Sequence, residues 1–126
     1  MRLLFDTQIL LWRMHGTRRL GHEAEQRVED ADELLVSVVS FVEIGVKAAT
    51  GKLRMPAGLR EYVLESGARI LGLSPEHGLG IAELPLHHRD PFDRLLISQA
   101  RSESLTIVTS DPQFARYDVR VVAAGA

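Results

Sequence analysis

The sequence predicts an α/β fold in which a mostly parallel central sheet lies between two layers of helices, forming a three-layer α/β/α sandwich. Short apolar runs typical of buried strands alternate along the chain with segments of helical periodicity. Strands joined by helical crossovers form parallel sheets that are covered on both faces. The carboxyl ends of such strands meet at one edge, where open α/β sheets bind their ligands.

The composition indicates one domain, residues 1–126, because typical domains have about 100–150 residues and 45% of this chain is hydrophobic. No apolar run reaches about 18 residues, so we expect no membrane span. The apolar start is interrupted by Asp6 and lacks a small-residue cleavage site, so we expect no secretion signal. The absence of cysteine excludes disulfides and thiolate chemistry and is compatible with a cytoplasmic protein.

Five apolar runs predict the strands. The strands are expected over residues 2–5, 34–39, 69–73, 105–108 and 119–122. The third is expected near an edge of the sheet. The last four residues, 123–126, are expected to form a frayed tail.

Helical periodicity fills the segments between these strands. Helices are expected from residue 9, over 20–31, 40–49, 59–66 and 75–82, and from residue 91 onward. Ser74 and Pro75 are a typical N-cap and first helical residue, whereas Gly51 and Gly67 are typical stops. Because the helix over 40–49 is apolar on nearly all sides, we predict that it is an inner helix.

Two acids follow the first two strands. Asp6 comes directly after the strand over 2–5, where Asp6 or Thr7 could cap the next helix or line a ligand site. Ser40 and Glu43 have the spacing of a capping box. An acid in an inner helix is costly unless it is paired or binds metal, and Lys47 is a possible partner four residues on.

Two further acids open the helix after residue 90. Asp90 is a typical N-cap, Pro91 suits the first helical position, and Asp93 lies in the first turn, where the helix dipole favours an anion. Capping alone would explain this pair of acids. Arg94 could pair with Asp90 or neutralise a phosphate.

Asp111 repeats the placement of Asp6, just past the carboxyl end of an apolar strand. A single acidic pocket would explain the positions of four acids of the chain, whereas the alternative is that each acid separately caps a helix. The four are Asp6, Glu43, Asp93 and Asp111. Crowded carboxylates raise one another's pKa values, and Mg²⁺ or Mn²⁺ would remove that repulsion. Such a pocket suits activation of water for displacement at phosphorus.

The remaining polar residues near these acids have less specific roles. Thr109 and Ser110 could hold a carboxylate or a phosphate oxygen, or could cap a turn. A zinc site is not expected, because the histidines are scattered and cysteine is absent. His87 and His88 are expected to be surface residues, with a phosphate or loop contact from His88 as the alternative.

Four motifs together resemble the PIN-domain ribonucleases, and most closely the VapC-type toxins of bacterial and archaeal toxin–antitoxin pairs. The motifs are LLFDTQILLW, S-x-x-E-I-x-x-K followed by G-K-L, L-P-x-x-H-x-D-P-F-D-R-x-L-x-x-Q-A, and T-x-D-x-x-F. They occur in the family's order over nearly the whole chain, and D-P-F-D-R with the preceding L-P-x-x-H is the most specific.

This resemblance implies a metal-dependent endoribonuclease that forms homodimers and is neutralised by an antitoxin, a segment of which crosses the acidic groove. It implies that Asp6, Glu43, Asp93 and Asp111 are the catalytic and Mg²⁺-binding acids (Mn²⁺ could substitute), with Asp90 as a flanking acid. Gln8 departs from the family, in which histidine often follows D-T.

Three other interpretations differ in their requirements. A phosphoacceptor receiver domain would need paired acids near the first strand and a lysine after the last, but Asp6 stands alone and the final lysine is Lys52. A haloacid-dehalogenase-like phosphatase would need an acid at the position of Gln8. A catalytically silent binding module of the same fold remains as an alternative.

Overall fold

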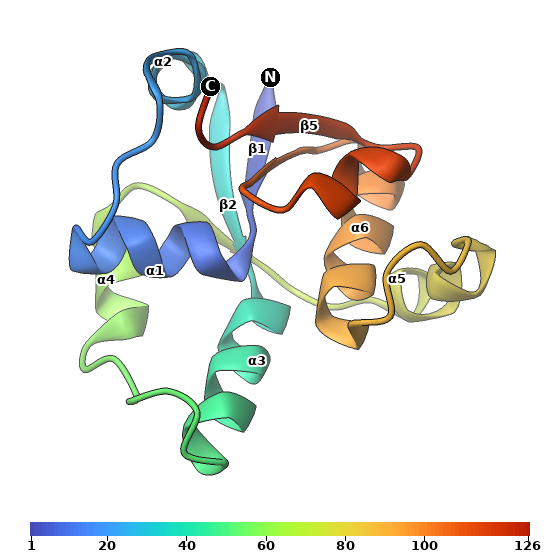
Figure 1. Ribbon diagram of the computed structural model, residues 1–126, viewed down its shortest axis with the longest axis horizontal. Coiled ribbons are helices and arrows are strands. Elements are labelled where there is room, and N and C mark those ends of the chain that lie inside the picture. Colours follow the sequence, from blue (N-terminus) through green and yellow to red (C-terminus); the bar gives the residue numbers. More distant parts are fainter.

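The computed structural model describes residues 1–126 and contains a five-stranded sheet in which every pair of neighbouring strands is parallel (Figure 1). The strands are β1 (Arg2–Phe5), β2 (Glu33–Ser37), β3 (Arg69–Leu71), β4 (Thr106–Thr109) and β5 (Arg120–Ala123). Their order is β3-β2-β1-β4-β5, which confirms the parallel sheet and the edge position of the third strand. The chain leaves β1 toward β2 and later returns to the other side of β1 with β4, so the strand order reverses at β1.

Helices cover both faces of this sheet. They are α1 (Thr7–His15), α2 (His22–Asp30), α3 (Val38–Ala49), α4 (Leu59–Glu65), α5 (Pro75–Leu79) and α6 (Pro91–Glu103), with 3-10 helices η1 (Gly80–Glu83) and η2 (Pro112–Arg116). None of them has the length and hydrophobicity needed to cross a membrane.

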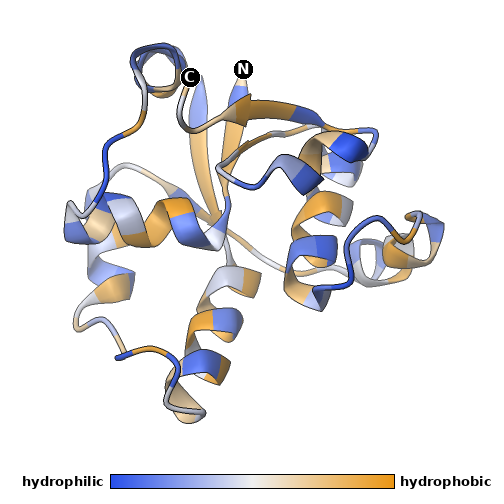
Figure 2. Cartoon of the chain, in the orientation of Figure 1, coloured by the Kyte–Doolittle hydropathy of each residue, from blue (hydrophilic) through white to orange (hydrophobic).

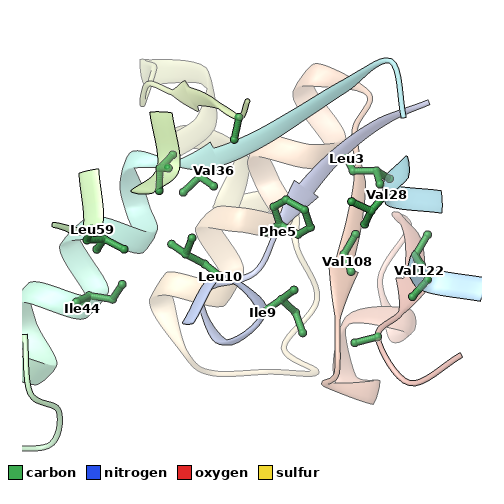
Figure 3. Close-up of a cluster of buried hydrophobic side chains, with 14 residues drawn as sticks. Leu3, Phe5, Ile9, Leu10, Val28, Val36, Ile44, Leu59, Val108 and Val122 are labelled. Atoms are coloured by element: carbon green, nitrogen blue, oxygen red, sulfur yellow. The ribbon is translucent and has the colours of Figure 1, made fainter. Parts of the chain in front are cut away.

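Two buried clusters form the core, one on each face. Leu3 and Phe5 of β1 belong to the cluster with α1, α2 and α4, which is drawn in Figure 3. Leu4 belongs to the other cluster, where it joins Leu96 of α6 and Phe114 of η2. Because alternate residues of β1 point to opposite faces, a continuous apolar run is needed there, and Figure 2 shows β1 as hydrophobic along most of its length. The predicted three-layer sandwich is confirmed.

The boundary between β2 and α3 differs from the prediction. The strand ends at Ser37 instead of residue 39, because the Ser37 side chain accepts a hydrogen bond from the Val39 amide (3.0 Å) and caps the helix there. The capping-box interpretation is therefore wrong: Ser40 lies inside the helix, with its hydroxyl 2.9 Å from that of Thr7. The inner-helix prediction is also wrong, because Val42 and Val46 of α3 are about half exposed.

The carboxyl-terminal tail is docked, which contradicts the prediction that it frays. Ala124 is buried, and its amide donates to the Thr109 carbonyl (2.8 Å). The Ala124 carbonyl in turn accepts from the Gly21 amide (2.8 Å), and the Ala126 carbonyl accepts from the Ala24 amide (3.1 Å). Figure 1 shows the C-terminus beside α2. Backbone hydrogen bonds to β4 and to the start of α2 hold these residues in place, and no local sequence pattern predicts them.

Candidate metal centre and active site

A pocket of about 230 Å³ lies at the carboxyl edge of the sheet, where the strand order reverses. The four predicted acids all line it, although they come from different elements: Asp6 follows β1, Glu43 lies on α3, Asp93 opens α6 and Asp111 follows β4. Asp90, Lys47, Thr7 and Ser110 also line it. The shared edge of a parallel sheet thus brings together residues that are up to 105 positions apart (6 to 111).

Asp6 is both a helix cap and a member of the pocket. One carboxylate oxygen accepts from the Ile9 amide (2.8 Å) at the start of α1, and the other accepts from the Thr109 hydroxyl. Burial raises the pKa of Asp6 to about 6, against the effect of these two hydrogen bonds. The Thr109 hydroxyl oxygen also accepts from the Asp111 amide (3.0 Å), so Thr109 joins two of the acids.

Glu43 has one paired and one unpaired oxygen. Oε2 accepts from Lys47 Nζ at 2.7 Å, which is the expected pairing four residues apart. That hydrogen bond raises the pKa of Lys47. Oε1 is buried, since the Glu43 side chain is only 6% exposed, and it has no hydrogen-bond partner. A buried carboxylate oxygen without a partner is costly, so this atom indicates a place for a cation.

The start of α6 holds Asp90 and Asp93 in different environments. Asp90 is the predicted N-cap, and its Oδ1 accepts from the amides of Phe92 (2.8 Å) and Asp93 (3.1 Å). The Asp93 carboxylate also lines the pocket, but it does not cap the helix. Its pKa is raised to about 7, first by burial and then by the negative charges of Asp90 and Glu43.

His88 enters this acidic cluster, a placement that the sequence interpretation missed. Its Nε2 lies 2.8 Å from Asp93 Oδ2 and 3.2 Å from Asp111 Oδ2, without the alignment of a hydrogen bond. The ring packs edge-to-face on Phe114, with its centroid 6.3 Å from that of Phe114. The available signal was the short spacing H-x-D-P-F-D, which places His88 beside the acid-bearing helix.

Arg94 takes neither of its two expected roles. The guanidinium is buried and does not line the pocket, and no ion pair joins it to Asp90. It donates to backbone carbonyls of η1 and of the loop that follows it, at Ile81, Leu84, Pro85 and His88, over 2.9–3.2 Å. Tyr117 also binds this loop, because its hydroxyl accepts a hydrogen bond from the His88 amide (2.7 Å). Arg94 and Tyr117 therefore hold the loop that carries His88 into the cluster.

The donor set fits a hard divalent cation. It consists mainly of carboxylate oxygens, which Mg²⁺ and Mn²⁺ prefer, and it includes the unpaired oxygen of Glu43. The raised pKa values of Asp6 and Asp93 show that the metal-free pocket disfavours its own negative charge. Potential ligand atoms of His88, Asp93 and Asp111 all lie within 4.8 Å of one another. A single cation could therefore contact several of these side chains.

A family profile described as "PIN domain" matches residues 3–120. The chain belongs to the PIN-domain family. Among curated proteins it is similar to Ribonuclease VapC22 of Mycobacterium tuberculosis (strain ATCC 25618 / H37Rv), with 28% identity over 112 residues that cover 86% of each protein. This assignment confirms the resemblance that the four sequence motifs predicted.

Solved structures of low sequence identity share the fold. VapBC2 from Rickettsia felis, bound to a DNA fragment from its promoter, has a TM-score of 0.71 and 16% identity, covering 98% of both chains. VapBC-5 from Mycobacterium tuberculosis, a member of the VapBC family of toxin–antitoxin systems, has a TM-score of 0.63 and 20% identity, covering 99% of this chain and 98% of the other. These structures therefore share the fold over nearly the whole chain.

Proposed function

We propose that this PIN-domain protein is a metal-dependent endoribonuclease that cleaves RNA phosphodiester bonds as the toxin of a toxin–antitoxin pair. The observation that carries the proposal is that four acids from four separate elements line one pocket, and that one buried oxygen of Glu43 has no partner there. The similarity to a curated protein named as a ribonuclease supports RNA as the substrate. Mg²⁺ is the proposed cofactor, and Mn²⁺ would substitute because it accepts the same oxygen ligands.

In this proposal, Asp6, Glu43, Asp93 and Asp111 hold the metal. A bound divalent cation would supply Lewis-acid charge that activates water and offsets the charge developing at phosphorus. The protein's own groups set the positions of the acids: Thr109 fixes Asp6, Lys47 occupies one oxygen of Glu43, and His88 stands between Asp93 and Asp111. Asp90 stabilises the start of α6 and adds negative charge.

We also propose a protein antitoxin as partner, a homodimer as the assembled form and the cytoplasm as the place of action. The solved structures of similar fold include VapBC complexes, described as toxin–antitoxin systems, which supports the antitoxin. Half-exposed Val42 and Val46 on α3 are available to such protein contacts.

The test measures RNA cleavage by the purified protein with Mg²⁺ or Mn²⁺, and again with EDTA. Asp93→Asn removes one pocket carboxylate with little change of shape. Asp118→Asn is the matched control, because Asp118 is an exposed acid that lines a hollow with Arg120 at the opposite edge of the sheet. Calorimetric titration of metal into the three proteins accompanies the cleavage assay.

We expect cleavage that requires metal, disappears in Asp93→Asn and persists in Asp118→Asn. Metal binding without cleavage of any of several structured and unstructured RNAs would favour the binding-module alternative. Failure to bind metal, together with failure to cut, would contradict the proposed chemistry altogether.

A further inference from the structure

Two exposed arginines stand side by side in the turn that joins α1 to α2. Neither Arg18 nor Arg19 has a carboxylate within the 4.0 Å that defines an ion pair, although the net charge of the protein is −2. Adjacent positive charges without counter-charges attract anions, and arginine matches the geometry of phosphate. This turn is therefore a candidate contact for a phosphate-bearing ligand.

An aromatic ring accompanies these charges. Trp12, the only tryptophan of the chain, is partly exposed, and the guanidinium carbon of Arg18 lies 4.6 Å from the centroid of its ring. The stacking holds a flexible cation in one place. Proteins that bind single-stranded nucleic acids combine cations for the backbone with aromatic rings on which bases stack.

The basic turn lies next to the acidic pocket. A hollow of about 450 Å³, which we call the basic groove, is lined by Trp12, Arg18 and Arg19 on one side and by Ser110 and Asp111 on the other. Ser110 and Asp111 also line the acidic pocket, so the two hollows share a wall. A strand of nucleic acid could thus pass from the acids to the arginines without leaving the surface.

Backbone contacts hold the turn in this position. The Gly16 amide donates to the Trp12 carbonyl (2.8 Å) at the end of α1, with Gly16 in the left-handed region (φ 65°) that favours glycine. At the other end, the Gly21 amide donates to the Ala124 carbonyl (2.8 Å). A Cβ atom on Gly21 would come within 2.1 Å of the Ala126 carbonyl oxygen, so the close approach to the tail requires glycine. A turn fixed at both ends loses little entropy when it binds a ligand.

We infer that the basic groove holds the single-stranded RNA next to the bond that is cut, with Arg18 and Arg19 on phosphates and Trp12 against a base. This inference rests on the proposed ribonuclease function. The acidic pocket repels every phosphate except one that faces a bound cation, so the neighbouring phosphates need positive charge outside it. The basic groove supplies that charge at the wall of the pocket.

The test uses protein kept metal-free with EDTA, so that RNA binds without being cut. A labelled, unstructured RNA of about 12 nucleotides is titrated while its anisotropy and the emission of Trp12 are followed. The double variant Arg18→Gln/Arg19→Gln is compared with Arg101→Gln/Arg120→Gln, which removes two exposed arginines that line one hollow at the amino edge of the sheet. Urea unfolding midpoints verify that both double variants remain folded.

We expect RNA to quench Trp12 and the groove variant to bind about tenfold more weakly than the wild type. The slope of log affinity against log salt should fall by about 1.4, which corresponds to two lost phosphate contacts on a single strand. The amino-edge variant should match the wild type. These results would support the basic groove as the RNA path.

Other outcomes would overturn the inference. Unchanged RNA affinity in the groove variant, or Trp12 emission that does not respond to RNA, would place the RNA elsewhere. Quenching by a poly-glutamate peptide and not by RNA would identify a docking site for an acidic protein segment. If the groove variant cleaves RNA with metal and binds RNA as tightly as the wild type, the ribonuclease function would be supported and the basic groove would be excluded as the RNA path. Absence of such cleavage in the wild type would overturn both.

Discussion

The amino ends of the strands form one edge of the sheet (the amino edge) and their carboxyl ends form the other (the carboxyl edge). Both edges carry acids, but in opposite electrostatic settings. At the amino edge, Glu33 pairs with Arg69 (3.0 Å) and Arg2 (3.5 Å), and Asp32 contacts the amino terminus. The hydrogen bond from Arg69 lowers the pKa of Glu33, and the contact with the amino terminus lowers that of Asp32. Because these acids are solvated and paired with positive charges, their charged form is stabilised.

The carboxyl edge reverses both conditions. Five acids line one pocket, where Lys47 is the only basic residue of the lining and His88 contacts two of the acids. Burial raises the pKa of Asp6 to about 6 and that of Asp93 to about 7. The comparison teaches that the counter-charge and burial of an acid, and not its residue type, distinguish a structural ion pair from a candidate metal ligand.

The largest contrast is expected between Asp6→Asn and Glu33→Gln. Asp6→Asn should lower the rate of metal-dependent RNA cleavage by about 10³-fold or more, because a lost ligand removes several kcal/mol of transition-state stabilisation. Glu33→Gln, an equal loss of charge at the amino edge, should leave the rate unchanged. Single-turnover cleavage at saturating metal measures both, and equal losses would erase the distinction between the two edges.

Substitution of Arg94 tests whether this buried charge stabilises the fold or binds the substrate. Arg94→Met should lower the free energy of unfolding by about 3 kcal/mol, because four backbone carbonyls lose a buried charged donor. Tyr117→Phe, which frees the His88 amide and two longer contacts of 3.4 Å, should cost about 1 kcal/mol. Urea denaturation measures both. A stable Arg94→Met protein that has lost RNA binding alone would assign Arg94 to the substrate.

The raised pKa values predict how stability depends on pH in the metal-free protein. Folding raises the pKa of Asp6 from 3.8 to about 6, so the folded state holds this proton more tightly than the unfolded state. That stabilisation is fully present below pH 4 and is lost as the pH rises through about 6. Chemical denaturation in EDTA at several pH values should show the loss.

Asp6→Asn sharpens this pH test. The variant keeps a side-chain oxygen for the helix cap but has no charge to bury, so at pH 8 it should be more stable than the wild type by up to about 3 kcal/mol. Saturating Mg²⁺ should narrow the difference, because the metal stabilises only the wild-type carboxylate. A variant that is less stable than the wild type at pH 8 without metal would show that burying the Asp6 charge does not destabilise the protein, and would contradict this prediction.

The smallest effect is expected at the neighbouring histidines. His88→Gln should weaken Mn²⁺ binding about tenfold, because the ring that stands between Asp93 and Asp111 no longer orients their carboxylates. His87→Gln should have no effect, since His87 is exposed and packs on Tyr117 outside the pocket. Isothermal titration calorimetry distinguishes them. Equal Mn²⁺ affinities would exclude His88 from the centre.

The sequence alone predicted the layered fold and the acids that meet at one edge. Continuous apolar runs such as 2–5 predict strands buried on both faces, and the parallel arrangement then brings residues after separate strands to the same edge. The N-cap at Asp90 and the pairing of Glu43 with Lys47 were also predictable, because caps and pairs four residues apart depend on local helix geometry.

The errors came from side chains and backbone groups whose partners are distant in the chain. Ser40 contacts Thr7, 33 residues away, instead of capping its own helix. The tail over 123–126 carries no local signal of order, yet it is held by the amides of Gly21 and Ala24. Arg94 resembles a surface charge in the sequence but lies buried among carbonyls of another loop.

By itself, then, the sequence determined the order of strands and helices and the presence of acids at their junctions, since periodicity and capping act over a few residues. Only the tertiary structure decided which charges lack counter-charges. It placed His88 between two acids, left one oxygen of Glu43 unpaired and set the arginine turn beside the pocket. The physical reason is that burial and electrostatic pairing depend on distances between elements, and packing sets those distances.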